Sequence, residues 1–518
     1  MAVGELMIPV DLLTSPRCRA EHLGLPMPDS RHAVSACLPL WHHNIRYEEG
    51  DPDIVGRLQA AYPRFCLHPF VRELCRKAFG GDSRGLIFPS RKAAERALEY
   101  VRFRGAETGT LVALAANASS ARMGPSCEGP GYGVAITEEE FPKLREYWQH
   151  AGEVITSRAA ELILNKQPVV CSETAARATV RDRLAELRGG CAEDVWLFPS
   201  GMAAIAAVWR ALRTHDASNP SVQFGFPYVD TLKIQQRFAP ADYRLFPVGD
   251  ASDVDQLESL MQSQIVSAVF CETPTNPLLT SPDLPRLRTL ADQYGFLLVV
   301  DDTLAACIND NVLPFADIVV TSLTKYFSGY GDVLAGCATL NPNSRHADWL
   351  RAVMTSDFEE LLPDADIAVL ERNSRDLRQR VTTINRNAAI LARRFAEHHL
   401  IQSVYHPSLS TSAAELQCDG CRCGGLMSIV LRDPENTTPV FFDHLEICKG
   451  PNLGTNFTLC CPYTILAHYT ELEFVESCGV SRWLLRVSIG TEPVEELWSR
   501  FERAFAAAWP YSGRTKVA

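Results

Sequence analysis

One lysine, Lys325, follows a short apolar run at residues 318–320 and has the hydroxyl side chains of Ser322 and Thr324 nearby. Burial at the end of an apolar strand lowers the pKa of a lysine and leaves its amine nucleophilic. We therefore predict that Lys325 forms a Schiff base with a carbonyl compound, and that the two hydroxyls hold a phosphate close to the amine. The alternative is a lysine at the rim of a sheet with its amine in water.

Two more apolar runs end in polar side chains that a cofactor could use. Residues 296–300 lead directly into Asp301, and residues 266–271 lead into a polar turn that contains Asn276. Open α/β sheets bind their ligands at the carboxyl ends of the strands. A buried carboxylate needs a cationic partner, which a protonated pyridine nitrogen would supply. The pattern predicts that Asn276, Asp301 and Lys325 meet at one edge of a sheet.

A phosphate-binding turn is predicted after residues 196–200, where an apolar run leads into a helical pattern. The free N–H groups and the dipole of a helix N-terminus suit a phosphate. Residues 86–90 echo this segment, but the first copy continues with Arg91 and the second with Gly201. Only glycine lets the backbone come close to a bound anion. We therefore assign phosphate binding to the second turn, through Gly201 and Met202.

The spacing of these runs predicts the fold. Between about residues 195 and 342, short apolar runs alternate with helical periods, a pattern typical of βαβ units and a parallel sheet. A later helical stretch followed by further strands predicts a smaller domain. We divide the chain into an N-terminal extension (1–150), a large α/β cofactor-binding domain (151–355) and a small α+β C-terminal domain (356–518). Within the extension, we expect residues 1–60 to be irregular and anchored by apolar side chains such as Trp41.

The composition limits the partners and the compartment. The 518 residues carry a formal net charge of −12, which disfavours binding to nucleic acid. Seventeen cysteines without regular spacing, and a start unlike a signal segment, predict a cytoplasmic location. No apolar run approaches the ~18 residues that a membrane helix needs. Cys418, Cys421 and Cys423 are close together, but no second cluster matches them, so we expect reduced thiols and no metal site.

Five motifs lie in order along the chain, at residues 200–204, 272–278, 301–303, 322–329 and 485–490. Together they resemble the motifs of the cystathionine γ-synthase family, which consists of pyridoxal-phosphate enzymes of cysteine and methionine metabolism. Residues 38–50, 62–65 and 371–376 resemble the long fungal branch of that family, which includes enzymes of secondary metabolism. The resemblance implies a fold-type I transferase that depends on pyridoxal 5'-phosphate (PLP), with a mostly parallel, seven-stranded type of sheet. It also implies a homo-oligomer built as a dimer of dimers.

The resemblance further implies a role for each residue of the PLP site. Lys325 would form the internal aldimine and move protons at Cα and Cβ, while Asp301 would pair with the pyridinium nitrogen. Tyr228 would stack on the ring and belong to the catalytic group. The other implied cofactor ligands are Gly201, Met202, Asn276, Thr303, Ser322 and Thr324.

The same resemblance implies a site for an amino-acid substrate. Arg486 would bind the α-carboxylate, a task that suits the planar guanidinium. Asn452 stands where the family generally has a serine near that carboxylate, and Asp302 replaces the usual asparagine after the cofactor aspartate. We therefore expect Asn452 and Asp302 to lie near the substrate.

One family motif has two candidates in this chain. The family usually supplies a Tyr-x-Arg pair from a neighbouring subunit to the cofactor phosphate. Arg158 would meet this need with a modest insertion after it, whereas Tyr62 and Arg64 would require a long one. We prefer Arg158 because it requires the shorter insertion.

The reaction that the resemblance implies is γ-replacement on an O-acyl-L-homoserine, with an acetyl or succinyl leaving group. Cysteine as the nucleophile would give cystathionine through a vinylglycine-type intermediate. A carbon acid or an amine would instead give an unusual amino acid of a secondary-metabolite pathway. A γ- or β-eliminating lyase and a non-catalytic PLP-binding homologue are further alternatives on the same scaffold.

Overall fold

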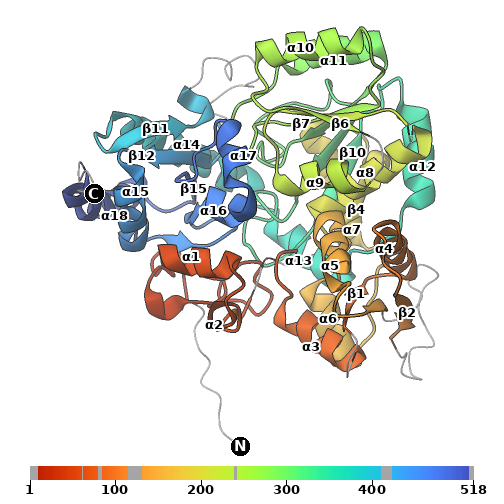
Figure 1. The fold of residues 1–518 in the computed structure, drawn as a ribbon, viewed down its shortest axis with the longest axis horizontal. Coiled ribbons are helices and arrows are strands. Elements are labelled where there is room, and N and C mark those ends of the chain that lie inside the picture. Colours follow the sequence, from red (N-terminus) through yellow and green to blue (C-terminus); the bar gives the residue numbers. More distant parts are fainter. Residues whose placement is uncertain are drawn as a thin grey trace, which may run out of the picture.

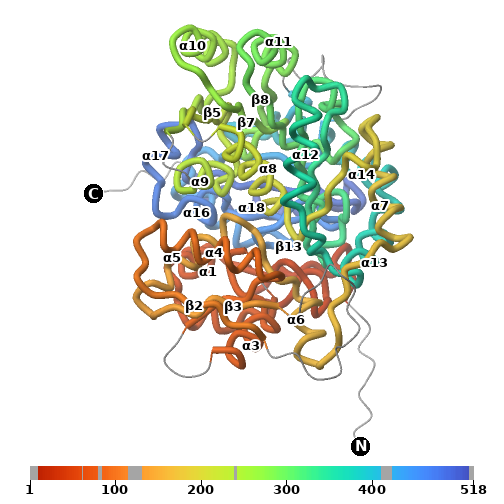
Figure 2. The backbone as a smooth tube through the Cα atoms, turned by 90° about the vertical axis from the view of Figure 1, so that its right-hand side faces the viewer, coloured from red at the N-terminus to blue at the C-terminus, as the bar shows by residue number. Residues whose placement is uncertain are grey.

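The structure is a computed structural model that describes residues 10–60, 62, 64–79, 84–114, 131–216, 218–238, 242–409 and 423–512. Three bodies of secondary structure pack together, with the middle of the chain at the upper right of Figure 1 and the C-terminal part at the left. Figure 2, turned by 90°, shows most of the N-terminal elements gathered below the other two bodies. Among the residues described, no helix is long and apolar enough to cross a membrane.

A seven-stranded sheet forms the centre of the largest body, in the order β4-β10-β9-β8-β7-β5-β6. β10 is antiparallel to both of its neighbours, and every other neighbouring pair is parallel. This topology confirms the predicted α/β class with a mostly parallel sheet. The strands are β4 (Val195–Phe198), β5 (Ser221–Phe224), β6 (Tyr243–Phe246), β7 (Ala268–Glu272), β8 (Leu297–Asp301), β9 (Ile318–Thr321) and β10 (Gly336–Leu340).

Helices cover both faces of this sheet (Figure 1). In β8, Leu297 and Val299 belong to the hydrophobic core beneath α8, whereas Leu298 and Val300 belong to the core beneath α10 and α11. This alternation is the ordinary consequence of the pleat, and it also sorts the polar residues that follow each strand. The helices are α7 (Ala175–Arg188), α8 (Gly201–His215), α9 (Val229–Arg237), α10 (Ala251–Met261), α11 (Leu284–Tyr294), α12 (Ala347–Asp357) and α13 (Asp364–Asn373).

The C-terminal body contains a five-stranded sheet in the order β11-β12-β15-β14-β13. Its core includes the buried rings of Phe395, Phe441 and Phe501 from the three long helices packed against it. The strands are β11 (Ile401–Tyr405), β12 (Leu426–Leu431), β13 (Cys448–Lys449), β14 (Leu459–Pro462) and β15 (Leu485–Ser488). The helices are α14 (Leu377–Glu397), α15 (Pro434–His444), α16 (Tyr463–His468), α17 (Leu472–Ser477) and α18 (Val494–Ala508).

The N-terminal part is more regular than we expected, since residues 1–60, which we expected to be irregular, contain the helices α1 and α2. It contains a three-stranded antiparallel sheet in the order β1-β3-β2, which the sequence did not reveal. The strands are β1 (Arg84–Phe88), β2 (Thr110–Ala113) and β3 (Tyr132–Ile136). The helices are α1 (Trp41–Glu48), α2 (Pro52–Val55), α3 (Pro69–Ala78), α4 (Arg91–Phe103), α5 (Phe141–Ala151) and α6 (Ser157–Leu164).

The repeated sequence noted above produces the same turn twice. Ser90 caps α4 by accepting a hydrogen bond from the N–H of Ala93 at 3.1 Å. Ser200 caps α8 in the same way, accepting from the N–H of Ala203 at 3.0 Å. The first turn faces Glu359, to which the Ser90 hydroxyl donates at 3.0 Å. The second turn, in contrast, leads into the cavity that holds the candidate site.

Candidate active site

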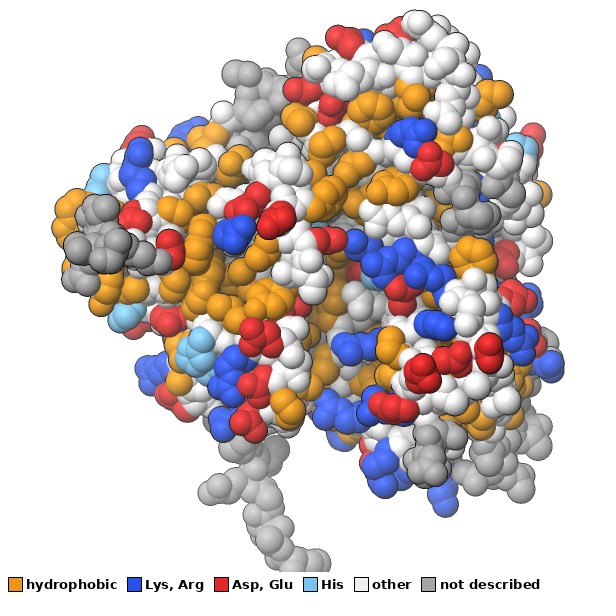
Figure 3. Space-filling view, in the orientation of Figure 1, with side chains coloured by type: hydrophobic (Ala, Val, Ile, Leu, Met, Phe, Trp, Pro, Cys, Tyr) orange, Lys and Arg blue, Asp and Glu red, His pale blue; other side chains and the backbone are white. Residues whose placement is uncertain are grey.

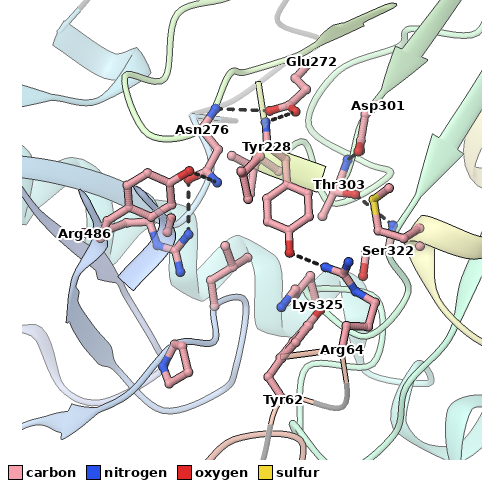
Figure 4. Close-up of a pocket in the computed structure, with 18 of the residues that line it drawn as sticks. Tyr62, Arg64, Tyr228, Glu272, Asn276, Asp301, Thr303, Ser322, Lys325 and Arg486 are labelled. Atoms are coloured by element: carbon pink, nitrogen blue, oxygen red, sulfur yellow. Dashed lines mark hydrogen bonds between the residues drawn. The ribbon is translucent and has the colours of Figure 1, made fainter. Parts of the chain in front are cut away.

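A cavity with about 940 Å³ of empty space, including its mouth, lies at the carboxyl edge of the large sheet (Figure 4). Nine of the twelve predicted site residues line it, while Thr324, Arg158 and Asn452 do not. The nine are Gly201, Met202, Tyr228, Asn276, Asp301, Thr303, Ser322, Lys325 and Arg486.

Lys325 lies just beyond β9, with its amine near the centre of the cavity. Its Nζ donates a hydrogen bond to Oδ1 of Asn452 at 2.6 Å and lies 4.3 Å from the centre of the Tyr62 ring. Burial lowers the pKa of Lys325, even though Tyr62 acts in the opposite direction. The neutral amine is therefore more accessible than in an ordinary lysine, as a carbonyl-binding lysine requires.

Tyr62 is a second acid–base group beside this amine. Burial alone would raise the pKa of the phenol, but the nearby cations of Lys325 and Arg64 outweigh it and lower that pKa. The sequence pattern suggested Tyr62 only as part of a phosphate-binding pair. Its contact with Lys325 arises because the chain returns to the sheet from far away in sequence.

Two carboxyl groups lie at neighbouring strand ends, where Glu272 of β7 pairs in register with Asp301 of β8. Burial raises the pKa of Asp301 to about 6, although Thr303 donates its N–H to Asp301 Oδ1 at 2.8 Å. Burial, followed by the charge of Asp301, also raises the pKa of Glu272. A protonated pyridine nitrogen beside Asp301 would offset this cost. Glu272 was missed as a lining residue, although it ends the same apolar run that led to Asn276.

The start of α8, which is the predicted phosphate-binding turn, lines part of the cavity. A Cβ atom at Gly201 would lie 2.7 Å from Cβ of Ser322, so only glycine fits this close approach. The first N–H groups of α8 have no partner within the helix and suit an anion. Thr324 does not share this role, because its hydroxyl is bound to the backbone of Ala335, accepting from N at 3.0 Å and donating to O at 3.2 Å.

Of the two arginines considered for the phosphate, Arg64 is the one that lines the cavity in this chain. It donates to Asp230 at 2.6 Å. It also donates to the hydroxyl of Tyr228 (Figure 4). Arg158 instead donates to Asp366 at 3.0 Å and lies outside the lining of the cavity. Within one chain the geometry favours Arg64, and a contribution of Arg158 to the cavity of a neighbouring subunit stays a prediction. The long insertion that counted against Arg64 consists of the three-stranded sheet and its helices.

Arg486 of β15 lines the cavity from the C-terminal body. Its guanidinium donates to Oδ1 of Asn276 at 3.2 Å and to the backbone oxygen of Asn452 at 3.4 Å. The Nδ2 atom of Asn452 is buried and makes no hydrogen bond within the described part of the chain. Because an unpaired buried donor is costly, this amide is suited to an acceptor on a bound molecule.

Asp302 corrects another expectation. It lies on the opposite face of the sheet from Asp301, buried and paired with Arg188 at 2.9 Å. Adjacent residues at a strand end point to opposite faces, so Asp302 cannot line the cavity that Asp301 lines. Its role is to hold α7 against the sheet.

The cysteine cluster considered for zinc falls largely outside the described residues, since Cys418 and Cys421 are not described and Cys423 is buried. Within the described ranges, no group of three or more histidine, cysteine, aspartate or glutamate side chains could hold a metal ion.

A buried amine, a strand-end carboxyl group, a tyrosine ring and a helix N-terminus form a donor set that fits PLP. On this sheet topology they define a fold-type I PLP-dependent enzyme. The chain belongs to the family of Cys/Met metabolism PLP-dependent enzymes, whose model matches residues 171–506. Residues 70–156 match the N-terminal domain of fungal trans-sulfuration enzymes. In this chain, these residues contain the three-stranded sheet.

Relatives and solved structures agree with this assignment. The chain is 34% identical to a cystathionine gamma-synthase of Neurospora crassa, over 94% of this chain and 98% of the relative. It is 33% identical to a cystathionine gamma-synthase-like protein of Aspergillus thermomutatus, over 93% of this chain and 94% of the relative. A solved cystathionine gamma synthase of Xanthomonas oryzae shares the fold, with a TM-score of 0.59, 24% identity and coverage of 67% and 94%.

Proposed function

We propose that the protein catalyses γ-replacement on an O-acyl-L-homoserine. This reaction moves protons at two carbons of the substrate, Cα and Cβ, before the acyl group leaves Cγ. The observation that carries the proposal is the pair of neighbouring acid–base groups, with Nζ of Lys325 4.3 Å from the centre of the Tyr62 ring. The names of the relatives support it, since cystathionine gamma-synthase recurs among them.

When bound, PLP supplies an electron sink for the charge that develops at Cα and Cβ. Asp301 and Tyr228 would hold its ring, and the start of α8 with Ser322 and Arg64 would hold its phosphate. Arg486 binds and orients the α-carboxylate of the substrate. Lys325 takes the proton from Cα and then moves a proton at Cβ. Tyr62 lies beside Lys325, affects the pKa of its amine and takes part in these proton transfers.

Release of acetate from O-acetyl-L-homoserine by the PLP-loaded enzyme tests the proposal. We expect Lys325→Ala to abolish release, and Lys92→Ala, on the exposed side of α4, to leave it unchanged. If Lys325→Ala retained parental turnover, the assignment of the base would be wrong. The same assay with O-succinyl-L-homoserine identifies the preferred leaving group, and product masses distinguish replacement from elimination by a lyase.

We also propose that the protein is a cytoplasmic homo-oligomer built as a dimer of dimers. The family resemblance supports this assembly, and the seventeen cysteines without regular spacing support the compartment. Light scattering of the purified protein tests the assembly, for which we expect four times the chain mass of 57.3 kDa.

A further inference from the structure

A second cavity lies in the N-terminal body and is lined by α3, α5 and β1. It has about 1250 Å³ of empty space, including its mouth. Each helix lines it with residues at the three- or four-residue spacing of one helix face. From α3 and its C-terminal end these are Arg72, Cys75, Arg76 and Phe79, and from α5 they are Phe141, Arg145 and Trp148. Both helices pack against β1, so the cavity is part of the fold of this body.

Four arginines line this cavity and give it a positive charge. Arg76 and Arg84 form ion pairs with glutamates that are outside the lining. Among the described residues, the other two, Arg72 and Arg145, form no ion pair and donate instead to backbone oxygens. Figure 3 shows several Lys and Arg side chains around the place where Figure 1 labels α3 and α5. The cavity is therefore suited to an anion.

The two arginines without an ion pair approach one short segment from different helices. Arg72 donates to the backbone oxygen of Leu67 at 3.4 Å, and Arg145 donates to that of Phe65 at 3.1 Å. These two residues flank Cys66. Burial raises the pKa of the Cys66 thiol, while the charges of Arg72 and Arg145 both act in the opposite direction. A guanidinium has five N–H donors, so each arginine keeps donors for a shared anion.

Glu48 of α1 does not neutralise this positive charge near pH 7. Its carboxyl group is close enough to Arg145 for the two charges to interact. Burial, however, raises the pKa of Glu48 to about 8, so the group is mostly protonated at pH 7.

Trp148 supplies a neutral donor on the same face of α5 as Arg145, three residues before it. Trp148 is 3% exposed, and its indole N–H has no hydrogen-bond partner among the described residues. A buried indole N–H usually has an acceptor, so this donor indicates that the cavity receives a ligand atom. Phe79 and Phe141 add two further rings to the lining.

We propose that this cavity binds a small organic oxyanion, which is a phosphate or carboxylate attached to an apolar body. The charged group lies between Arg72 and Arg145, because planar guanidinium groups match the oxygens of such anions. The apolar body lies against the rings of Phe79, Phe141 and Trp148, and the indole N–H donates to an acceptor on the ligand.

The proposed site is separate from the catalytic cavity but adjoins it. Phe65 lines both cavities, and no other described residue is shared by the two linings. A ligand in the second cavity therefore leaves the cofactor and substrate sites open, and it binds to the PLP-loaded enzyme.

Calorimetric titration with phenyl phosphate, which joins a ring to an oxyanion, tests the proposal. The PLP-loaded enzyme is used, so that the cofactor already occupies its own phosphate site. We expect saturable binding at one site per chain, at least tenfold tighter than the binding of inorganic phosphate or of benzyl alcohol. No binding of phenyl phosphate, or equal affinity for either control compound, overturns the proposal.

Three arginine variants locate the probe. We expect Arg145→Gln to weaken the binding of phenyl phosphate at least tenfold, whereas Arg102→Gln, on the exposed side of α4, leaves it unchanged. Arg486→Gln changes the arginine assigned to the substrate carboxylate and should also leave it unchanged. Parental affinity in Arg145→Gln overturns the proposal. Loss of binding in Arg486→Gln does so too, because it places the probe in the catalytic cavity.

Two further variants complete the test. Arg72→Gln replaces Arg145→Gln if circular dichroism shows that the latter fails to fold. Trp148→Phe keeps an aromatic ring and removes the indole N–H, so we expect it to weaken the binding of phenyl phosphate at least threefold. Unchanged affinity in a folded Trp148→Phe variant contradicts the proposed contact.

Discussion

The amine of Lys325 donates a hydrogen bond to the side-chain oxygen of Asn452, at 2.6 Å. This contact crosses from the end of the large sheet to a loop of the C-terminal body. Asn452 was expected near the substrate carboxylate, and the structure adds that its side chain holds the amine of Lys325. The other end of the same amide, Nδ2, is buried without a partner among the described residues.

Removal of the Asn452 side chain should slow the chemistry. In Asn452→Ala, Lys325 loses an acceptor that orients its amine, and a lost hydrogen bond to a charged group costs roughly 1.5–3 kcal/mol, or about 10- to 100-fold in rate. Steady-state kinetics should show the fall in kcat, with PLP affinity changed less. We expect Asn452→Ser to recover part of the rate because a hydroxyl can also accept. Parental kcat in the alanine variant would exclude this role.

PLP affinity should depend on pH through Asp301. Burial raises the pKa of this carboxyl group to about 6, so below that pH it is protonated and cannot pair with a ring nitrogen as an anion. Fluorescence titration with PLP between pH 5 and 8 should show affinity weakening as the pH falls through 6. Asp301→Asn should remove this dependence, whereas Asp302→Asn, on the opposite face, should retain it. An identical pH dependence in both variants would contradict the assignment.

The raised pKa of Asp301 weakens PLP binding at low pH, but it stabilises the folded protein without PLP at low pH. Because the folded pKa of Asp301 lies above the ordinary value of 3.8, the folded state binds this proton more tightly than the unfolded state. The resulting contribution to the free energy of unfolding is present below about pH 4 and is lost as the pH rises through 6. Urea unfolding of the PLP-free protein should show this component in the parent and not in Asp301→Asn. Its persistence in the variant would assign it to another group.

Arg64 and Arg158 make similar ion pairs with buried aspartates but should differ in function. Arg64 lines the cavity and Arg158 does not. We expect Arg64→Gln to weaken PLP binding at least tenfold, which corresponds to ~1.4 kcal/mol. Arg158→Gln is the matched control, since it also leaves a buried aspartate without its arginine. If Arg158→Gln weakened PLP binding as much as Arg64→Gln, the result would support the prediction that Arg158 meets the cofactor phosphate.

The ion pair between Arg188 and Asp302 should support stability without taking part in catalysis. Both side chains are buried, and removing one partner from such a pair costs roughly 3–5 kcal/mol. Arg188→Met should therefore lower the urea midpoint of unfolding strongly. The double variant with Asp302→Asn should regain part of the loss, because no charge is left unpaired. A double variant less stable than the sum of both single changes would contradict this coupling.

Much of the site could be predicted from the sequence because its residues follow recognisable strands. Lys325, Asp301 and Asn276 each come shortly after an apolar run, and parallel strands deliver such residues to one edge. Successive side chains of a strand point to opposite faces of the sheet, so the residue after Asp301 cannot line the same cavity. This rule alone would have excluded Asp302 from the substrate site.

Other parts of the site depend on contacts that local pattern does not encode. Tyr62 and Arg64 reach the cavity from a segment that precedes the whole three-stranded sheet. Many residues separate Arg64 from the start of α8, so the sequence spacing counted against Tyr62 and Arg64. Spacing alone does not show that the three-stranded sheet between them brings the chain back to the same cavity. The hydrogen bond from Lys325 to Asn452 was hidden for the same reason, since it joins two separate bodies of the fold.

The most direct test of the central claim follows the protons that Lys325 is proposed to move. The PLP-loaded enzyme converts O-acetyl-L-homoserine in D₂O with propane-1-thiol and, separately, with L-cysteine, and NMR locates deuterium in the product. Because Lys325 would exchange its protons with solvent while acting at both carbons, we predict deuterium at Cα and at Cβ. A replacement product with deuterium at neither carbon, or at Cα alone, would contradict the account.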